Sequence, residues 1–329
     1  MRDVTEEQSV ARAYRRWADV EAEDRSPRYA EWARGVADDE ALCAALGELE
    51  PVKRQPNLLF AAARFHGVPV APWAEVRDMI AGAWAEIRAT MLARMTQTNE
   101  ARRMATLLPA IAHVTGPIAL VEVGASAGLC LYPDRWRYRF GAGSYVGDAS
   151  LPLLETVASP STPIPTELPR VAWRGGLDLQ PLDPDDPGTK AWLEALVWPD
   201  ATGRVDGARV DRVRTAIAIA RRERAELRRG DLTTDTAELV ADARQHASTV
   251  VLWHSAVLAY VPAFERAAFA DLCGELGVTW VANEGATLEI GPPAPWASHA
   301  DFVLRRDAEP LAITDPHGAS ITWIDDITR

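Results

Sequence analysis

The first 115 residues place apolar side chains at the spacing of helix faces. Val10, Tyr14 and Trp17 share one face of a helix, and a longer apolar stripe runs from residue 76 to residue 95. We therefore expect residues 1–115 to form an all-helical N-terminal domain that caps the substrate site.

From residue 116 onward, short apolar runs alternate with amphipathic segments. The helical segments predicted here are 190–197, 204–229, 237–245 and 263–276. The runs predicted as strands are 118–123, 171–176, 249–253, 278–284, 302–306, 311–314 and 321–324. Strands that alternate with helices predict an α/β fold, here a doubly wound, mostly parallel, Rossmann-like sheet with a hairpin at one edge. We expect this domain to occupy residues 116–329.

Three further segments of this domain carry weaker patterns. Residues 135–141 alternate aromatic and arginine side chains, which predicts a half-exposed strand. Residues 147–169 are rich in Pro, Ser and Thr, so a surface loop is expected there. The predicted helix 204–229 carries nine arginines, which could clamp an anionic substrate. A solvated helix face with ion pairs is the commoner arrangement, and it is the one we expect.

The first predicted strand leads into a turn of small residues, Gly124-Ala125-Ser126-Ala127-Gly128. The apolar residues 129–132 follow and predict the start of a short helix. Strand, small-residue turn and helix together place backbone N–H groups and a helix N-terminus against a ligand. We therefore expect a binding site at this turn.

A helix predicted over residues 104–111 ends just before the first strand. A helix joined by a short turn to a strand usually runs antiparallel to it, so its N-terminus should lie near the strand's carboxyl end. Gln97, Thr98 and Asn99 would then lie over the small-residue turn. The alternative is that these residues only cap the helix, and the sequence favours neither.

Two of three ligand classes fit this turn poorly. A nicotinamide dinucleotide prefers G-x-G-x-x-G, whose third glycine is replaced here by Leu129, and no lysine follows as a P-loop would require. The G-x-S-x-G pattern also matches the nucleophile elbow of a serine hydrolase. Ser126 would be its nucleophile, with Asp231 or Asp271 as the acid and His254, His299 or His317 as the base. That fold needs strands before the elbow, whereas the N-terminal part of this chain is predicted to be helical.

The third ligand class is S-adenosylmethionine. A strand that ends acid-x-Gly-x-Ser-x-Gly resembles the first motif of class I methyltransferases, with Glu122 as the acid and Ser126 in place of the middle glycine. That resemblance implies that Glu122 lies near the amino end of the cofactor, Asp178 binds its ribose and Asp231 lies near its adenine. The implied cofactor-binding residues are Glu122, Gly124, Ala125, Ser126, Gly128, Asp178 and Asp231.

The same resemblance extends to the order of the strands. It implies that residues 250–254 form the fourth strand, and that the terminal strands form the reversed hairpin of a seven-stranded sheet. The insertion 135–170, which precedes the proposed second strand, departs from the pattern and places Asp178 far downstream.

Short segments along nearly the whole chain carry a narrower resemblance. They are Arg94–Arg102, Glu122–Leu129, Asp134-Arg135 with Tyr138, Arg174–Asp178 with Pro181–Asp183, Trp198–Asp200 and His254-Ser255. Together they resemble the bacterial domain-of-unknown-function family 2332, whose members usually have Asn where this chain has Cys130. The resemblance implies a fold of the methyltransferase type with polar clusters at the site, and it supplies no reaction.

These patterns lead to three hypotheses. The first is an S-adenosylmethionine-dependent methyltransferase whose small-molecule substrate enters between the sheet edge and the helical domain. Gln97, Asn99, Arg174 and His254 would line that space, with His254 as the first choice for a base. The second is a non-catalytic binding or sensor module, because no Asp-Pro-Pro-Tyr type motif follows the fourth strand. The third is a serine hydrolase using Ser126.

The amino-acid composition limits which binding partners and which cellular compartment we expect for this protein. A net charge of −12 argues against nucleic acid as the main partner, because phosphate binding needs a basic surface. The three cysteines are far apart without metal-ligand spacing, so we expect no metal and free thiols in a reducing cytoplasm. The polar N-terminus predicts no signal peptide, and no apolar run is long enough for a membrane span. We expect a cytoplasmic protein that acts on a small molecule.

Overall fold

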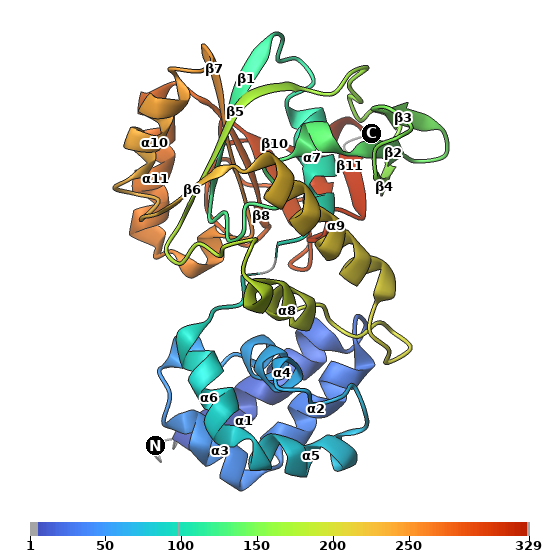
Figure 1. The fold of residues 1–329 in the computed structure, drawn as a ribbon, viewed down its shortest axis with the longest axis vertical. Helices are drawn as coiled ribbons and strands as arrows, with labels where there is room; N and C mark the ends of the chain where they lie inside the picture. The colour runs from blue at the N-terminus through green and yellow to red at the C-terminus, as the bar shows by residue number, and fades with distance from the viewer. Residues whose placement is uncertain (1–5, 98, 328–329) are drawn as a thin grey trace. The chain divides into compact units, whose positions relative to one another are not determined.

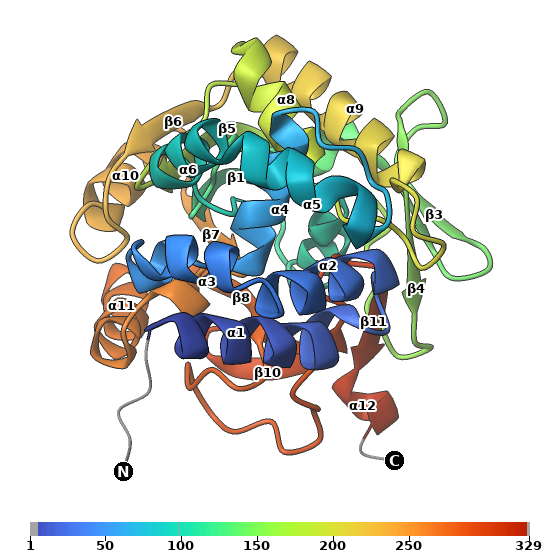
Figure 2. The same cartoon turned by 90° about the horizontal axis from the view of Figure 1, so that it is seen from below.

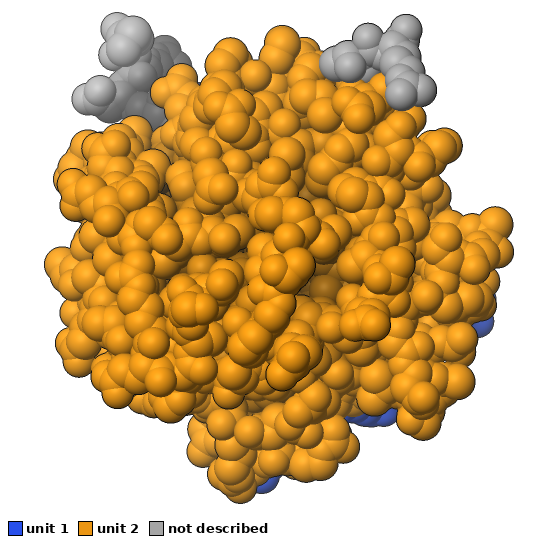
Figure 3. All heavy atoms as spheres, turned by 90° about the horizontal axis from the view of Figure 1, so that it is seen from above, with its two compact units in different colours: residues 1–98, 186–214 blue, residues 99–185, 215–329 orange. Residues whose placement is uncertain are grey.

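The computed structural model describes residues 6–97 and 99–327. The chain divides into two compact units, which are coloured separately in Figure 3. The helical unit comprises residues 1–98 and 186–214, and the sheet unit comprises residues 99–185 and 215–329. Residues 99–115, which the apolar pattern grouped with the N-terminal helices, belong to the sheet unit.

The helical unit is made of short helices. They are α1 (Glu6–Trp17), η1 (Ala18–Ala22), α2 (Pro27–Ala37), α3 (Glu40–Gly47), η2 (Pro51–Lys53), α4 (Pro56–Phe65), α5 (Trp73–Gly82), α6 (Trp84–Ala93) and α8 (Pro187–Ala195). Helices α2 and α3 both pack against α1 (Figure 2). Helix α9 (Gly207–Glu223) begins in this unit and ends in the sheet unit.

Aromatic side chains form the centre of the helical unit. The ring of Phe60 lies 5.0 to 6.3 Å, between centroids, from four other aromatic rings. These are the rings of Tyr14, Trp17, Tyr29 and Trp32. Trp198, from the later segment of the unit, lies 5.1 Å from Trp17. Edge-to-face and tilted contacts of this kind add to the stabilisation that burial provides.

The apolar pattern predicted some of these helices well and one of them wrongly. Val10, Tyr14 and Trp17 are all buried, so the predicted face of the first helix is confirmed. The stripe from residue 76 to residue 95 is not one helix, because α5 ends at Gly82 and α6 begins at Trp84. Glycine disfavours a helix interior, which explains why the chain breaks there while the apolar positions on both sides stay buried.

The sheet unit contains eleven strands among the described residues. They are β1 (Pro117–Val123), β2 (Arg137–Phe140), β3 (Ser144–Val146), β4 (Leu153–Ala158), β5 (Arg170–Asp178), β6 (Glu226–Arg229), β7 (Thr249–Ser255), β8 (Thr279–Gly285), β9 (Phe302–Arg306), β10 (Glu309–Thr314) and β11 (Ser320–Trp323). Their order in the sheet is β3-β2-β4-β11-β10-β9-β8-β7-β1-β5-β6. Strands β6, β5, β1, β7 and β8 are parallel, and β8 to β11 run antiparallel in turn. The predicted α/β fold with a large, mostly parallel sheet is confirmed.

Helices cover both faces of this sheet. They are η3 (Ala101–Arg103), α7 (Met104–Ala110), η4 (Pro133–Arg135), α10 (Thr236–Ala243), η5 (Leu258–Tyr260), α11 (Ala263–Leu276) and α12 (Ile324–Ile327). Helices α10 and α11 cover one face and α7 lies on the other (Figure 1). Ala119, Val121 and Val123 join the core beneath α10 and α11. Because side chains alternate along a strand, Leu120 and Glu122 point to the α7 face.

The sheet is larger than the seven strands that the methyltransferase resemblance implied. The insertion between residues 135 and 170 supplies β2, β3 and β4, and β4 pairs with β11 to extend the sheet. Strand β2 lies where residues 135–141 predicted one, but β4 lies within the predicted loop 147–169. The terminal strands are a meander that continues from β8, so the expected hairpin lies inside the sheet and not at its edge.

The arginine-rich segment 204–229 also departs from its prediction. It is a helix only as far as Glu223, after which β6 forms an edge strand beside β5. The two end residues of β6, Glu226 and Arg229, are exposed, so the strand lacks the apolar run that would have revealed it. No helix among the described residues is both long and apolar enough to cross a membrane.

Candidate functional site

The turn after β1 adopts a backbone that suits glycine at alternate positions. Gly124, Ser126 and Gly128 have φ values of 68°, 52° and 68°. The left-handed region costs a residue with a side chain roughly 1–2 kcal/mol, so Ser126 is held there by its surroundings. The predicted helix after the turn is absent, because residues 126–130 form turns and the next helical residues are those of η4. The expected helix N-terminus is therefore missing from this site.

The backbone amides of the turn are bonded within the chain. The N–H of Ala125 donates to Leu177 O at 3.0 Å, and that of Gly128 donates to Ala125 O at 2.6 Å. The N–H of Ser126 donates to Asp178 Oδ2 at 2.8 Å, and that of Leu129 donates to Asn99 Oδ1 at 2.9 Å. These four amides already have acceptors, so the turn does not present them as an anion-binding cradle.

Asn99 lies over the turn, as the antiparallel geometry predicted. Its Nδ2 donates to Ala125 O at 2.7 Å while its Oδ1 accepts from Leu129, and the side chain is buried. The residue that caps the following helix is Glu100, whose carboxylate accepts from the N–H of Arg102 at the start of η3. Gln97 belongs to the helical unit, and Thr98 lies outside the described residues.

Replacing Asn99 with alanine is expected to lower the free energy of unfolding by about 2–3 kcal/mol. The change leaves the buried N–H of Leu129 without a partner, which costs roughly 1–3 kcal/mol, and removes one of the two hydrogen bonds to Ala125 O, which is worth about 1 kcal/mol. Urea denaturation measures the loss. Asn99→Asp keeps the acceptor for Leu129 and serves as the partial control, and a loss no larger for alanine than for aspartate would contradict this role.

Asp178 ties the end of β5 to the turn. Its carboxylate accepts from the N–H groups of Ser126 and Gln180, each at 2.8 Å, and its carbonyl accepts from Gly230 N at 3.0 Å. Asp231 follows in the loop after β6, where hydrogen bonds from the hydroxyl and N–H of Thr233 lower the pKa of its carboxyl. Both acids shape loops at the carboxyl ends of neighbouring strands, which is the edge where α/β proteins bind ligands.

Glu122 is the buried carboxyl group beside the turn. Its side chain is 5% exposed, and its Oε2 atom has no hydrogen-bond partner among the described residues. Burial raises the pKa of Glu122 well above its ordinary value, Arg103 lowers it and Asp178 raises it further. In the sheet Glu122 pairs with Trp253, whose indole Nε1 is also buried without a partner among the described residues. An unsatisfied acceptor and an unsatisfied donor thus lie on neighbouring strands, on the α7 face.

His254 lies on the opposite face of the sheet, buried against α11. Its Nδ1 lies 2.7 Å from Glu284 Oε1, and Trp280 Nε1 donates to its Nε2 at 2.9 Å. An indole N–H only donates, so we assign Nε2 as the acceptor and Nδ1 as the protonated nitrogen of a neutral ring. Both ring nitrogens are engaged and the side chain is 0% exposed. This geometry offers no lone pair to a substrate.

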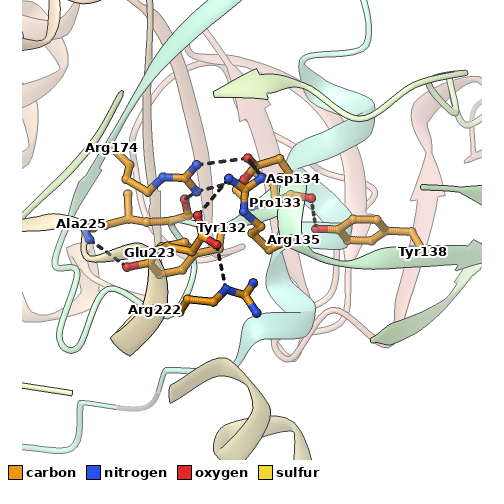
Figure 4. Close-up of polar contacts among 10 residues, drawn as sticks. Tyr132, Pro133, Asp134, Arg135, Tyr138, Arg174, Arg222, Glu223 and Ala225 are labelled. Carbon is orange, nitrogen blue, oxygen red and sulfur yellow. Dashed lines mark hydrogen bonds and ion pairs between the residues drawn. The ribbon is translucent and has the colours of Figure 1, made fainter. Parts of the chain in front are cut away.

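Arg174 stabilises the segment that follows the turn (Figure 4). Its guanidinium donates to both carboxylate oxygens of Asp134 at 2.9 and 3.1 Å and to Leu131 O at 3.0 Å. It also lies 5.0 Å above the ring centroid of Tyr132. Asp134 accepts in addition from Arg135, so this cluster is a closed set of ion pairs.

A pocket of about 310 Å³ lies near this cluster, in the sheet unit. The loop after β5 and the end of α9 form most of it, with Tyr132 and Leu227 at its base. Its two arginines, Arg221 and Arg224, both pair with Asp185. Arg221 and Arg214 of α9, and Arg224 just after it, thus pair with acids, as expected for a solvated helix face.

The structure brings together Asn99, Glu122, Asp178 and the residues of the turn, Gly124 to Gly128. His254, Arg174 and Asp231 each belong to a separate hydrogen-bond network. Sequence reasoning missed Glu284 and Trp280, the two partners of His254. The position of Glu284 in the sequence could have indicated this contact. Glu284 lies near the end of the strand that follows β7, and neighbouring parallel strands end at the same edge of a sheet.

Comparisons with known proteins add one match. The model of a protein family described as "uncharacterized protein conserved in bacteria" matches residues 11–323. No curated protein and no solved structure matches the chain.

Proposed function

For this chain, which belongs to the bacterial family of uncharacterized proteins DUF2332, we propose binding of S-adenosylmethionine beside the turn after β1 and methyl transfer to a small molecule. The family description names no reaction, so the proposal rests on the site. The observation that supports the proposal most directly concerns Glu122. This buried carboxyl group lies at the carboxyl end of a central strand, and its Oε2 atom has no hydrogen-bond partner among the described residues. A buried polar atom without a hydrogen bond is costly, and ionisable groups whose pKa values are strongly shifted cluster at functional sites.

An ammonium group satisfies the chemistry of Glu122. It would supply both a hydrogen-bond donor for Oε2 and a positive charge beside the buried carboxyl group. S-adenosylmethionine carries such a group on its amino acid end. The unsatisfied indole N–H of Trp253 on the neighbouring strand can donate to a carboxylate, which the same end of the molecule carries.

The other implied cofactor residues fit in a different way. Asp178 accepts from the backbone amides of Ser126 and Gln180. We therefore assign it the role of shaping the turn in preference to that of binding a ribose. Ala125, Ser126 and Gly128 use their amides within the chain. The strand order supports the proposal, since β5 lies beside β1 with β6 beyond it, and β7 lies on the other side of β1.

S-adenosylmethionine, when bound, supplies an electrophilic methyl group on a sulfonium. The chain's part is to bind and orient, and orientation alone accounts for much of the rate in transfers of this kind. Glu122 holds the ammonium, while Asn99 and Asp178 fix the turn. Trp280 donates to Nε2 of His254, so this ring offers a substrate no free lone pair. This observation favours, as the second candidate, a binding module without turnover, and it argues against His254 as the base of a serine hydrolase.

Calorimetry of the full chain with S-adenosylhomocysteine tests the proposal. We expect saturable binding at one site, at least tenfold tighter than that of 5′-methylthioadenosine, which shares the adenosine and the thioether but has no amino acid end. The difference would report the ammonium contact, since a hydrogen bond to a charged group is worth about 1.5–3 kcal/mol. Absence of heat with millimolar S-adenosylhomocysteine would rule the proposal out.

A further inference from the structure

The loop that follows β7 lies directly against the turn after β1. A Cβ atom built on Gly124 would lie 2.3 Å from Cγ2 and 2.9 Å from Cγ1 of Val257. The isopropyl group of Val257 therefore occupies the space beside the Gly124 Cα. Glycine is required at position 124 both by its φ of 68° and by this contact.

Two buried acceptors and one strained residue hold Val257 in this position. The carboxylate of Glu284 accepts from Val257 N at 2.9 and 3.2 Å and from Leu258 N at 3.3 Å. Asn283 O accepts from Ala256 N at 3.2 Å, and Ala256 has a φ of 59°. An alanine in the left-handed region costs roughly 1–2 kcal/mol, so the loop stores strain that a small movement would release.

His254 links this loop to the core of the sheet. Its Nδ1–H donates to the same Glu284 oxygen that accepts from Val257, and Trp280 fixes its other nitrogen. The position of Val257 is thus determined by a hydrogen-bonded chain on the far face of the sheet from Glu122. The Val257 side chain reaches from that chain to the turn.

From this geometry we propose that Val257 is the residue that controls ligand access to the turn, and that Glu284 positions it. The inference rests on the proposed function, because it concerns the ligand that lies beside Gly124. A ligand that approaches Gly124 meets two methyl groups, so binding requires the 255–258 loop to move. The apparent affinity is then reduced by the fraction of molecules in which the loop is displaced.

The test compares three substitutions by calorimetry with S-adenosylhomocysteine. Val257→Ala removes both methyl groups and is expected to bind about tenfold tighter than the native chain. A change of this size is expected if the loop is displaced in about one native molecule in ten and in most molecules of the variant. Val257→Ile adds a methylene and is expected to bind more weakly. Val261→Ala is the matched control, since it makes the same truncation in a half-buried valine of the same segment, packed on the core beneath α10 and α11.

The outcomes separate this inference from the proposed function. Tighter binding by Val257→Ala alone, including binding where the native chain shows none, supports both. Equal affinity of the native chain, Val257→Ala and Val261→Ala overturns the role of Val257 and leaves the proposed function standing. No binding by any variant overturns both.

Hydrogen exchange supplies a readout that does not depend on heat of binding. The amides of Val257 and Leu258 are protected by Glu284, and we expect their exchange to quicken when S-adenosylhomocysteine displaces the loop. Glu284→Gln retains one acceptor oxygen, and it should raise the exchange of these two amides in the ligand-free protein. Binding without any change at these amides would show that Val257 does not move, which contradicts the inference.

Discussion

Replacing Glu122 with glutamine is expected to stabilise the ligand-free protein at neutral pH and to weaken S-adenosylhomocysteine binding at least tenfold. The expected gain in the free energy of unfolding is about 1–3 kcal/mol, because glutamine is neutral at every pH, whereas burial disfavours the charged form of the native carboxyl group. Glutamine keeps the shape of the side chain and removes its charge. A merely structural residue would show the opposite pattern, with lower stability and unchanged binding.

The pH dependence of this effect has a definite sign. Burial, opposed by Arg103 and reinforced by Asp178, raises the pKa of Glu122 in the folded state well above that of the unfolded chain, about 4.3. The stabilisation from the protonated form is complete below the unfolded pKa and is lost as the pH rises through the folded pKa. Glutamine does not titrate, so the variant and the native chain should converge in acid and diverge towards pH 8.

Melting temperatures measured from pH 4 to pH 8 check this prediction. Glu275→Gln, an exposed position on α11, is the matched control and should follow the native curve. If Glu122→Gln melted below the native protein at pH 7, the carboxylate would have a structural partner and the ammonium site would lose its basis.

Replacing Glu284 with alanine is expected to cost about 3–5 kcal/mol of unfolding free energy. The change leaves three buried or half-buried donors without an acceptor, namely the Nδ1–H of His254 and the amides of Val257 and Leu258. Each buried donor that is left without an acceptor costs roughly 1–3 kcal/mol, and three such donors account for a loss of this size. Urea denaturation of the full chain measures the effect.

Two further variants give this experiment its controls. Glu309→Ala removes an exposed glutamate from β10 and should change stability by less than about 0.5 kcal/mol. Glu284→Gln retains one acceptor oxygen, so its loss of unfolding free energy should lie between the losses of Glu284→Ala and Glu309→Ala. A loss for Glu284→Ala as small as that for Glu309→Ala would show that the His254 network does not hold the loop.

The sequence predicted the elements whose patterns come from burial. The central strands β1, β7 and β8 are continuous apolar runs because both faces of the sheet are covered, and they were found close to their true bounds. The position of Asn99 followed from chain geometry alone, since a helix that leads into β1 must start near the end of β1.

The rest could not be predicted because its causes are not local. Strand β6 is an exposed edge with arginine and glutamate side chains, so nothing in its four residues distinguishes it from the end of α9. The helix expected after Gly128 fails because its amides find other acceptors, including Asn99, thirty positions away. The partners of His254 lie on β8, and only the register of two parallel strands brings them together.

The composition of the helical unit has a consequence for how the protein is made. This unit takes Trp198 from a segment that follows β5, so its aromatic centre cannot close while only the first 98 residues have left the ribosome. Until residue 198 emerges, Trp17 and Tyr29 lack the indole that packs against them. The N-terminal helices therefore lack this part of their aromatic centre while β1 to β5 are synthesised. Completion of the helical unit is in this way timed by the translation of the sheet.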